Sequence, residues 1–208
     1  AGLPLFVIIP LSGLITAAVG MIFGIPSLRL KGLYLAMATL AAHFIIEFVI
    51  VHWESATGGV DGLSIPNAEL FGFALDHDRS LFYLIYVLVI AFALFATNLF
   101  RTKVGKAFVA IRDQDISAEV MGVNIFKYKL LAFGVSSFYV GVAGSLMAYQ
   151  ARIISPENFP ITVAIDYLAM IIIGGLGSIL GSILGALFIT VLPEILRLTT
   201  TALSGIYP

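Results

Sequence analysis

LFYLIYVLVIAFALFATNL, residues 81–99, contains no charged side chain and no glycine or proline. As a helix it rises about 1.5 Å per residue, which matches the roughly 30 Å hydrocarbon core of a bilayer. The stretch therefore predicts a membrane-spanning helix, and we expect the chain to be an integral membrane protein.

Similar apolar stretches lie on both sides of it. We expect further spans at residues 3–25, 33–51 and 130–150, each separated from the next by a polar or basic segment. The predicted fold class is all-α: a polytopic transmembrane helix bundle with five to six membrane segments in one domain, residues 1–208.

The last apolar stretch, residues 167–196, is too long for one perpendicular span, because its length as a helix is about 45 Å. Gly174-Gly175-Leu176-Gly177-Ser178 is a strong turn signal inside it. We expect a short helix, this turn and then a full span over about 179–196; one tilted helix is the alternative. Asp166 is expected to cap the N-terminus of the first helix, where a carboxylate favours the helix dipole.

Composition supports a membrane protein and excludes several kinds of site. The 208 residues are 60% hydrophobic and 11% charged, whereas soluble domains carry about 25% charged residues. No cysteine is present, which excludes disulfides and thiolate metal sites. We expect no metal site and no nucleic-acid partner.

The two longest polar loops differ in charge. Residues 101–129 contain six lysines and arginines against three acidic residues, whereas residues 52–80 contain one arginine against five acidic residues. Lysine and arginine accumulate in loops on the cytoplasmic side of a membrane. The pattern predicts a cytoplasmic loop over 101–129 and an external loop over 52–80.

The 101–129 loop is itself predicted to be helical. From Gly105 to Met121 there is no proline or internal glycine, and Gly122 suits a helix stop. An amphipathic helix here could lie on lipid headgroups, but its acidic residues would be repelled by anionic lipid, which favours docking of a protein. These residues are Asp113, Asp115 and Glu119.

The same segment resembles a known family. AIRDQDISAEVMGVN, residues 110–124, is similar to the cytoplasmic coupling segment of ABC importer permeases of the branched-chain amino acid (LIV) type. The general importer pattern, Glu-Ala-Ala, three residues and Gly, matches only at Ala118 and Gly122. The LIV variant, Ala-Ala-Glu-x-Met-Gly followed by Ile or Val and Asn, is broken only at Ser117.

Other motifs of that family follow in the same order, and the resemblance covers about residues 25–197. Each motif alone is weak, and their order and spacing give the resemblance its strength. They are RLKGLYLA at 29–36, TGG at 57–59 with Gly62, SPENF at 155–159 and GGLGS at 174–178.

The resemblance implies the permease subunit of an ATP-driven importer for branched-chain or other small apolar amino acids, in the bacterial inner (plasma) membrane. It implies two ABC ATPase subunits that bind ATP and Mg, a second permease subunit and a periplasmic or external substrate-binding protein. Permeases of the family have further helices at both ends, so the single permease domain over 1–208 is expected to lack N-terminal spans and the last span. The implied ATPase-coupling contacts are Arg112, Asp113, Asp115, Ala118, Glu119 and Gly122.

No catalytic motif is present. The sequence has no Gly-x-Ser-x-Gly nucleophile elbow, no His-Glu-x-x-His and no Walker A loop. We therefore expect no catalytic residue, no enzyme activity and no cofactor on this chain, and ATP would have to be bound by another subunit.

His43 and Glu47 lie one helical turn apart inside the second span. Ionisable groups are costly in a bilayer and point to function by default; the structural alternative is a mutual hydrogen bond facing the bundle interior, or Glu47 approaching the outer interface. Together with Thr57, Gly58 and Gly59 they are candidates for a substrate path or gate. A proton-coupled secondary transporter using His43 and Glu47 is the alternative function, and a membrane scaffold without transport is a third.

Small residues recur at four-residue spacing within the predicted spans. Such stripes let helix backbones approach closely in lipid, where burial of apolar surface gives no drive for association. We expect tight helix packing along three of them: Ser137, Gly141 and Ser145; Gly177, Gly181 and Gly185; and Gly20 with Gly24.

Overall fold

The structure is a computed structural model that describes residues 5–28, 30, 32–65, 69–70, 73–74 and 78–204. The structure divides into two compact units, residues 1–156 and 157–208, and the single permease domain expected over 1–208 stays a prediction. The second unit is separate because its two helices pack on each other.

Long apolar helices dominate both units, which confirms the all-α polytopic fold. By length and composition, five segments of the described chain can cross a membrane: Leu5–Pro26, Arg79–Arg101, Ile125–Ala151, Pro156–Gly174 and Ile179–Thr201. The helices themselves are α1 (Leu5–Ser27), α2 (Leu33–His52), α4 (Asp78–Arg101), α7 (Ile125–Ala151), α8 (Ile161–Gly174) and α9 (Ile179–Ser204). Met37–His52 of α2 is a shorter apolar segment.

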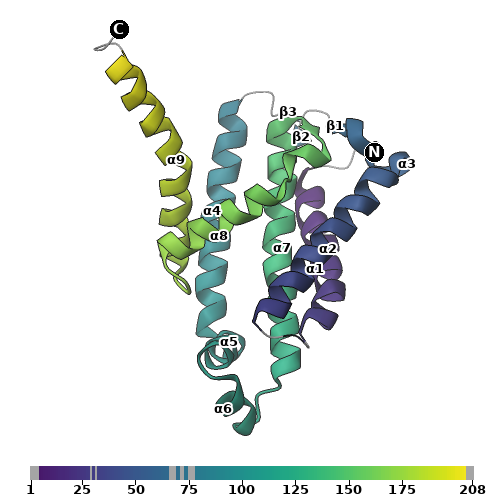
Figure 1. Cartoon of the computed structure of the whole chain (residues 1–208), viewed down its shortest axis with the longest axis vertical. Helices are drawn as coiled ribbons and strands as arrows, with labels where there is room; N and C mark the ends of the chain where they lie inside the picture. Colours follow the sequence, from purple (N-terminus) through teal and green to yellow (C-terminus); the bar gives the residue numbers. More distant parts are fainter. Residues whose placement is uncertain are drawn as a thin grey trace. The chain divides into compact units, whose positions relative to one another are not determined.

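Short elements connect these helices (Figure 1). After α2 come α3 (Glu54–Thr57), the 3-10 turn η1 (Gly59–Asp61), β1 (Leu63–Ser64), β2 (Glu69–Leu70) and β3 (Phe73–Ala74). Between α4 and α7 lie α5 (Lys103–Asp113) and α6 (Asp115–Val120), and after α7 come β4 (Ile153–Ile154) and the 3-10 turn η2 (Pro156–Asn158). β1 pairs with β4, and β2 with β3, both antiparallel.

Helices α1 and α7 form the centre of the first unit, and small residues let them approach. A Cβ added to Gly20 would overlap the side chain of Ser137, and one added to Gly141 would lie 2.5 Å from Thr16 Oγ1. The Ser12 hydroxyl crosses the same interface to the Gly141 carbonyl oxygen, 3.2 Å away. The stripe on α7 thus packs against α1 through Ser137 and Gly141.

The other stripe residues of this unit, Gly24 and Ser145, make different contacts. Gly24 faces the Phe133 ring of α7, so it also belongs to the α1–α7 interface. The Ser145 hydroxyl donates within its own helix to the Val142 carbonyl at 2.8 Å.

The buried core lies beside this interface. It consists of Leu5 and Ile9 from α1 with Val142 and Leu146 from α7, and apolar side chains of α4 pack against it. The Tyr139 hydroxyl of α7 donates to the Phe92 carbonyl of α4 at 3.0 Å. The three helices therefore form one packed body.

The two connecting regions lie at opposite ends of the first unit. Figure 1 shows α5 and α6 at the end where α4 finishes and α7 begins, and α3 and β1 at the other end. This arrangement is what the predicted placement of residues 52–80 and 101–129 on opposite sides of a membrane requires.

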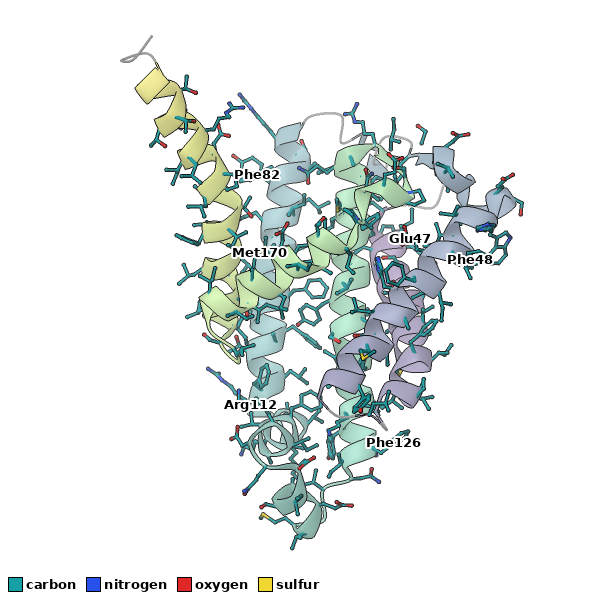
Figure 2. The ribbon with its side chains drawn as sticks, in the orientation of Figure 1. Glu47, Phe48, Phe82, Arg112, Phe126 and Met170 are labelled. Carbon is teal, nitrogen blue, oxygen red and sulfur yellow. The ribbon has the colours of Figure 1, made fainter. Side chains whose placement is uncertain are left out.

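The second unit is a helical hairpin, which decides between the two alternatives for the last apolar stretch. α8 is 14 residues long, or about 21 Å, which is shorter than the hydrocarbon core. A Cβ on Gly181 would overlap the Gly174 carbonyl oxygen, and one on Gly185 would overlap that of Met170. Met170 is labelled in Figure 2.

Two expectations for this unit are wrong. Gly177 lies in the turn with φ +86° rather than on the packed stripe, because a reversal after α8 needs a residue with positive φ. Asp166 does not cap α8: the helix begins at Ile161, with Pro160 as its N-cap, so Asp166 lies in the second turn.

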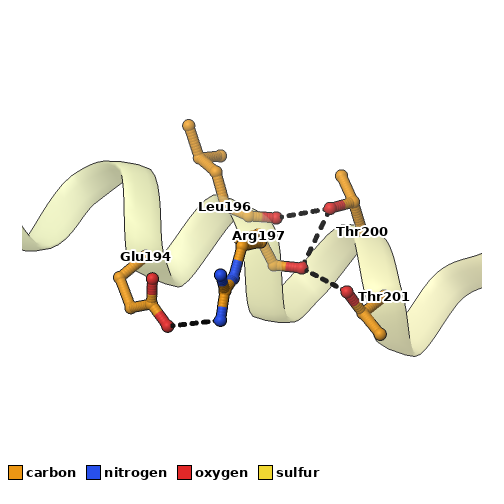
Figure 3. Close-up of polar contacts among 5 residues, drawn as sticks. All are labelled: Glu194, Leu196, Arg197, Thr200 and Thr201. Atoms are coloured by element: carbon orange, nitrogen blue, oxygen red, sulfur yellow. Dashed lines mark hydrogen bonds and ion pairs between the residues drawn. The ribbon is translucent and has the colours of Figure 1, made fainter.

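The end of α9 satisfies its own polar groups (Figure 3). Glu194 Oε1 and Arg197 Nη2 are 3.3 Å apart, three residues apart on one helix face. The Thr201 hydroxyl donates to the Arg197 carbonyl at 2.8 Å, and that of Thr200 lies 2.9 Å from the Leu196 carbonyl. These contacts reduce the cost of holding polar side chains near lipid.

Candidate functional site

The connector between α4 and α7 begins with a sharp corner. Thr102 alone separates α4 from α5, and its hydroxyl donates to the Leu99 carbonyl at 2.7 Å and accepts from the Gly105 N–H at 3.3 Å. Gly105 is buried, and a Cβ there would overlap the backbone of Leu99 and Phe100. Only glycine allows α5 to cross the end of α4 at this distance.

α5 is also attached to α7. The rings of Phe108 and Tyr128 meet edge to face with centroids 6.4 Å apart, a geometry that aromatic pairs favour. Ala107 and Ile111, on the same side of α5, are buried. Arg112, labelled in Figure 2, lies in the last turn of α5 and is exposed.

The single helix predicted over Gly105–Met121 is wrong, because it breaks at Gln114. This residue has φ −157° and ψ 99°, an extended conformation between α5 and α6. The charges on either side fit the break: Arg112 lies in the last turn of α5 and Asp115 in the first turn of α6. Cations stabilise helix C-termini and anions N-termini.

α6 ends at Val120, and Gly122 stops the helix at C′, as the sequence predicts. Gly122 has φ +86°; its N–H donates to the Glu119 carbonyl at 2.9 Å, and the N–H of Val123 donates to the Ala118 carbonyl at 3.0 Å. This pair of bonds is a Schellman motif, which favours glycine at the left-handed position. Asn124 then caps α7 by accepting from the Lys127 N–H at 3.0 Å.

The charged residues expected to contact an ATPase have partners within the chain. Arg112 Nη2 lies 3.0 Å from Asp113 Oδ1, and Lys129 Nζ lies 4.0 Å from Asp115 Oδ2. An exposed pair such as Arg112–Asp113 contributes only about 0–1 kcal/mol to stability. Glu119 is exposed.

Ala118 cannot be a direct contact, which corrects the expectation for this residue. It is 3% exposed, because it lies on the inner side of α6. A small side chain there lets α6 lie against its neighbours, so Ala118 positions the helix.

The outward side of α6 carries apolar residues that sequence reasoning missed. Ile116 is 70% exposed, Val120 84% and Met121 85%. Ile116 and Val120 are four residues apart and therefore share a helix face. Their apolar character in a charged loop was the sequence signal that could have identified them. We call these three residues the apolar face of α6.

His43 and Glu47 come together on α2. His43 Nε2 and Glu47 Oε2 are 3.7 Å apart, with side chains 33% and 47% exposed. Figure 2 labels Glu47 beside Phe48. The pair is therefore a local contact within α2 that leaves Glu47 half exposed.

Thr57, Gly58 and Gly59 form a compact turn after α2. Gly58 ends α3 in the left-handed conformation, with φ +72°. Thr57 Oγ1 lies 2.6 Å from the Ile50 carbonyl oxygen and accepts from the Gly59 N–H at 3.2 Å. These contacts account for the motif by turn geometry; its assignment to a gate stays a prediction.

The same region is tied to the end of α7 by the β1–β4 pair. Leu63 pairs with Ile154 and Ser64 with Ile153, and the Ile65 N–H donates to the Arg152 carbonyl at 2.8 Å. A Cβ on Gly62 would overlap the Ile154 carbonyl oxygen. We call this pairing, residues 62–65 with 152–154, the β clasp.

Comparison with known proteins relates the chain to transport permeases. A family model described as branched-chain amino acid transport system / permease component matches residues 1–206. The high-affinity branched-chain amino acid transport system permease protein LivM of Salmonella typhimurium is 34% identical over 94% of this chain and 52% of its own length, and LivM of Escherichia coli gives the same values. The ribose import permease protein RbsC of Haemophilus influenzae is 26% identical over 94% of this chain and 62% of its own length.

The chain thus spans about half the length of the LivM proteins that it matches. No solved structure matches it at a significant level. The family match covers almost all of the chain, and the helical membrane fold described above agrees with it. The chain belongs to the permease component family of branched-chain amino acid transport systems.

Proposed function

We propose that this chain is part of the membrane permease of an ATP-driven importer for branched-chain or other small apolar amino acids. The full permease pairs with a second permease subunit, two cytoplasmic ATPase subunits that bind ATP and Mg, and an external substrate-binding protein. It resides in the bacterial inner (plasma) membrane with residues 101–129 in the cytoplasm.

The apolar face of α6 is the observation that carries this proposal. Three large apolar side chains at 70–85% exposure stand in a charged connector beyond the ends of α4 and α7. Burying an exposed side chain of this size stabilises a complex by about 1.5–3 kcal/mol. A groove on an ATPase subunit that covers these residues would thus hold α6 firmly.

The connector can pass movement of such a partner to the membrane helices. α5 is attached to α4 at Gly105 and to α7 at the Phe108–Tyr128 contact. Closure of the ATPase pair on ATP would displace α6 and shift the bundle between outward-open and inward-open states. ATP must bind the two states with different affinity, because equal affinity shifts no equilibrium.

An apolar zwitterion suits the composition of the spans. The described residues of α1 carry no charged side chain, and in α4 charges occur only at the ends. A charged solute would find few partners along these helices. Branched-chain amino acids, which the LivM relatives transport according to their names, have the matching chemistry.

Co-purification tests the proposal. The full-length chain, expressed with the genes that accompany it and purified in mild detergent, is expected to retain an ATP-binding protein. After reconstitution into proteoliposomes, the complex is expected to accumulate labelled leucine only when ATP is present on the side of the membrane that carries the ATPase subunits. Leucine uptake driven by a proton gradient without any ATP-binding protein would favour the alternative based on His43 and Glu47.

A further inference from the structure

We propose that Gly105 is a positioning residue for transport: it makes the corner between α4 and α5 rigid, so that displacement of α6 reaches α4 and α7 together. This inference rests on the proposed function and names the residues through which coupling passes. Neither Gly105 nor the Phe108–Tyr128 contact belongs to the motif that resembles the LIV coupling segment.

The backbone contact at Gly105 is the first support. A Cβ on this residue would overlap the Leu99 carbonyl oxygen and the Phe100 Cα, both of which are backbone atoms of α4. Backbone cannot rotate away as a flexible side chain can. Gly105 lies inside a helix and is absent from the glycines with positive φ, so glycine is needed here for space and not for conformation.

Hydrogen bonds make the corner short and closed. The Thr102 N–H donates to the Leu99 carbonyl at 3.0 Å, and the Lys106 N–H donates to the Thr102 carbonyl at 3.0 Å. The Thr102 hydroxyl adds one bond to each side of the corner. With every one of these groups paired, α5 cannot swing on a loose loop relative to α4.

A second attachment point holds α5 against α7 as well as against α4. Phe108 lies one turn after Gly105 and meets Tyr128 of α7, and Ile111 is buried one turn further on. α4 and α7 are also joined within the bundle by the Tyr139–Phe92 hydrogen bond. α5 is thus held by both helices, whereas the apolar face of α6 is open to a partner.

The test separates coupling from assembly. Gly105→Ala is introduced into the full-length chain, and three quantities are measured in the purified complex: the amount of ATP-binding protein retained, ATP hydrolysis and uptake of labelled leucine in proteoliposomes. The control is Gly144→Ala on α7, where an added Cβ meets nothing within 4 Å.

We expect Gly105→Ala to retain the ATP-binding protein and its hydrolysis within about two-fold, while leucine uptake falls at least about ten-fold, because assembly energy is kept and only transmission is lost. Gly144→Ala should match the unmodified protein. Unchanged uptake in Gly105→Ala would overturn the proposal, and so would loss of the ATP-binding protein in this variant alone. Absence of an ATP-binding protein from the unmodified complex would instead refute the proposed function.

A second variant keeps the test decisive if Gly105→Ala fails to fold. The chain has no cysteine, so Phe108→Cys with Tyr128→Cys places one thiol pair at the α5–α7 contact. Uptake is expected to fall when the aromatic rings are removed and to recover when a short bifunctional thiol reagent joins the two positions. Further loss of uptake on joining them would show that α5 must move against α7, which contradicts a rigid corner.

Discussion

Gly62 lies so close to Ile154 that a Cβ on the glycine would overlap the isoleucine carbonyl oxygen. The two residues lie far apart in the sequence, and they are held together by the β clasp. The clasp joins the segment that follows α2 to the end of α7, and its geometry leads to a direct test.

A disulfide across the clasp should form readily. Ser64 and Ile153 are opposite each other and, by alternation from the bonded pair Ile65–Arg152, form a non-hydrogen-bonded pair. Such pairs have Cα atoms about 4.5 Å apart, within the range of disulfides. Ser64→Cys with Ile153→Cys is expected to form a disulfide in membranes. After proteolytic cleavage of the chain between the two positions, the disulfide should keep the fragments together on a non-reducing gel. It should also raise the thermal unfolding temperature. The same pair in a Gly62→Ala background should oxidise poorly; equal oxidation in both would contradict the clasp.

The apolar face of α6 should dominate binding of the ATPase. Ile116→Asp with Val120→Asp is expected to reduce retention of the ATP-binding protein by at least about ten-fold, because two apolar side chains that the ATPase would cover, worth about 1.5–3 kcal/mol each, are replaced by charge. Val60→Asp, at 61% exposure in the turn η1, is the matched control. Charge reversal at Asp113, Asp115 or Glu119 should weaken retention of the ATP-binding protein less than the two apolar substitutions do. If charge reversal had the larger effect, the ATP-binding protein would be held by the charged residues rather than by the apolar face of α6.

Close packing of α1 on α7 predicts where an extra methyl group destabilises the bundle. Gly20→Ala forces a Cβ into the Ser137 side chain, and overpacking of this kind costs about 1–3 kcal/mol. Thermal unfolding in detergent should show a lower midpoint for Gly20→Ala. Gly144→Ala, at an open position of α7, should be neutral or slightly stabilising. Equal midpoints for the two variants would mean that the helices are not in contact at Gly20.

The His43–Glu47 pair gives the test of the alternative function. His43→Ala removes the imidazole ring whose Nε2 lies 3.7 Å from Glu47 Oε2. If the pair has a structural role, ATP-driven leucine uptake should stay within about two-fold of the unmodified protein, since a half-exposed pair contributes about 1 kcal/mol or less. Loss of uptake in a fully assembled complex would assign the pair to proton coupling.

Hydrophobic patterning predicted the membrane helices because an uncharged apolar stretch of about the length of a span can be recognised directly in the sequence. The glycine-rich segment at 174–178 likewise predicted the α8–α9 hairpin, since the need for positive φ is a local property. Gly122 was identified as the end of α6 for the same reason. Such features are fixed by a few neighbouring residues.

Features that depend on three-dimensional packing were not predictable. Good helix formers run through Gln114, yet this residue is extended and separates α5 from α6. The direction of α6 also depends on this break, which turns Ala118 inward and Ile116 outward. Sequence spacing alone therefore selected the charged residues of the connector and missed its apolar ones.

Labelling of Met121→Cys tests the central claim most directly. Met121, the C-cap of α6, is 85% exposed, and these 208 residues contain no cysteine. A membrane-impermeant maleimide should label this cysteine in inside-out vesicles stripped of the ATPase, fail to label it in intact spheroplasts, and label it weakly once the ATP-binding protein is bound again. Labelling from the outside of spheroplasts, or equal labelling with and without the ATP-binding protein, would contradict a cytoplasmic coupling role for α6.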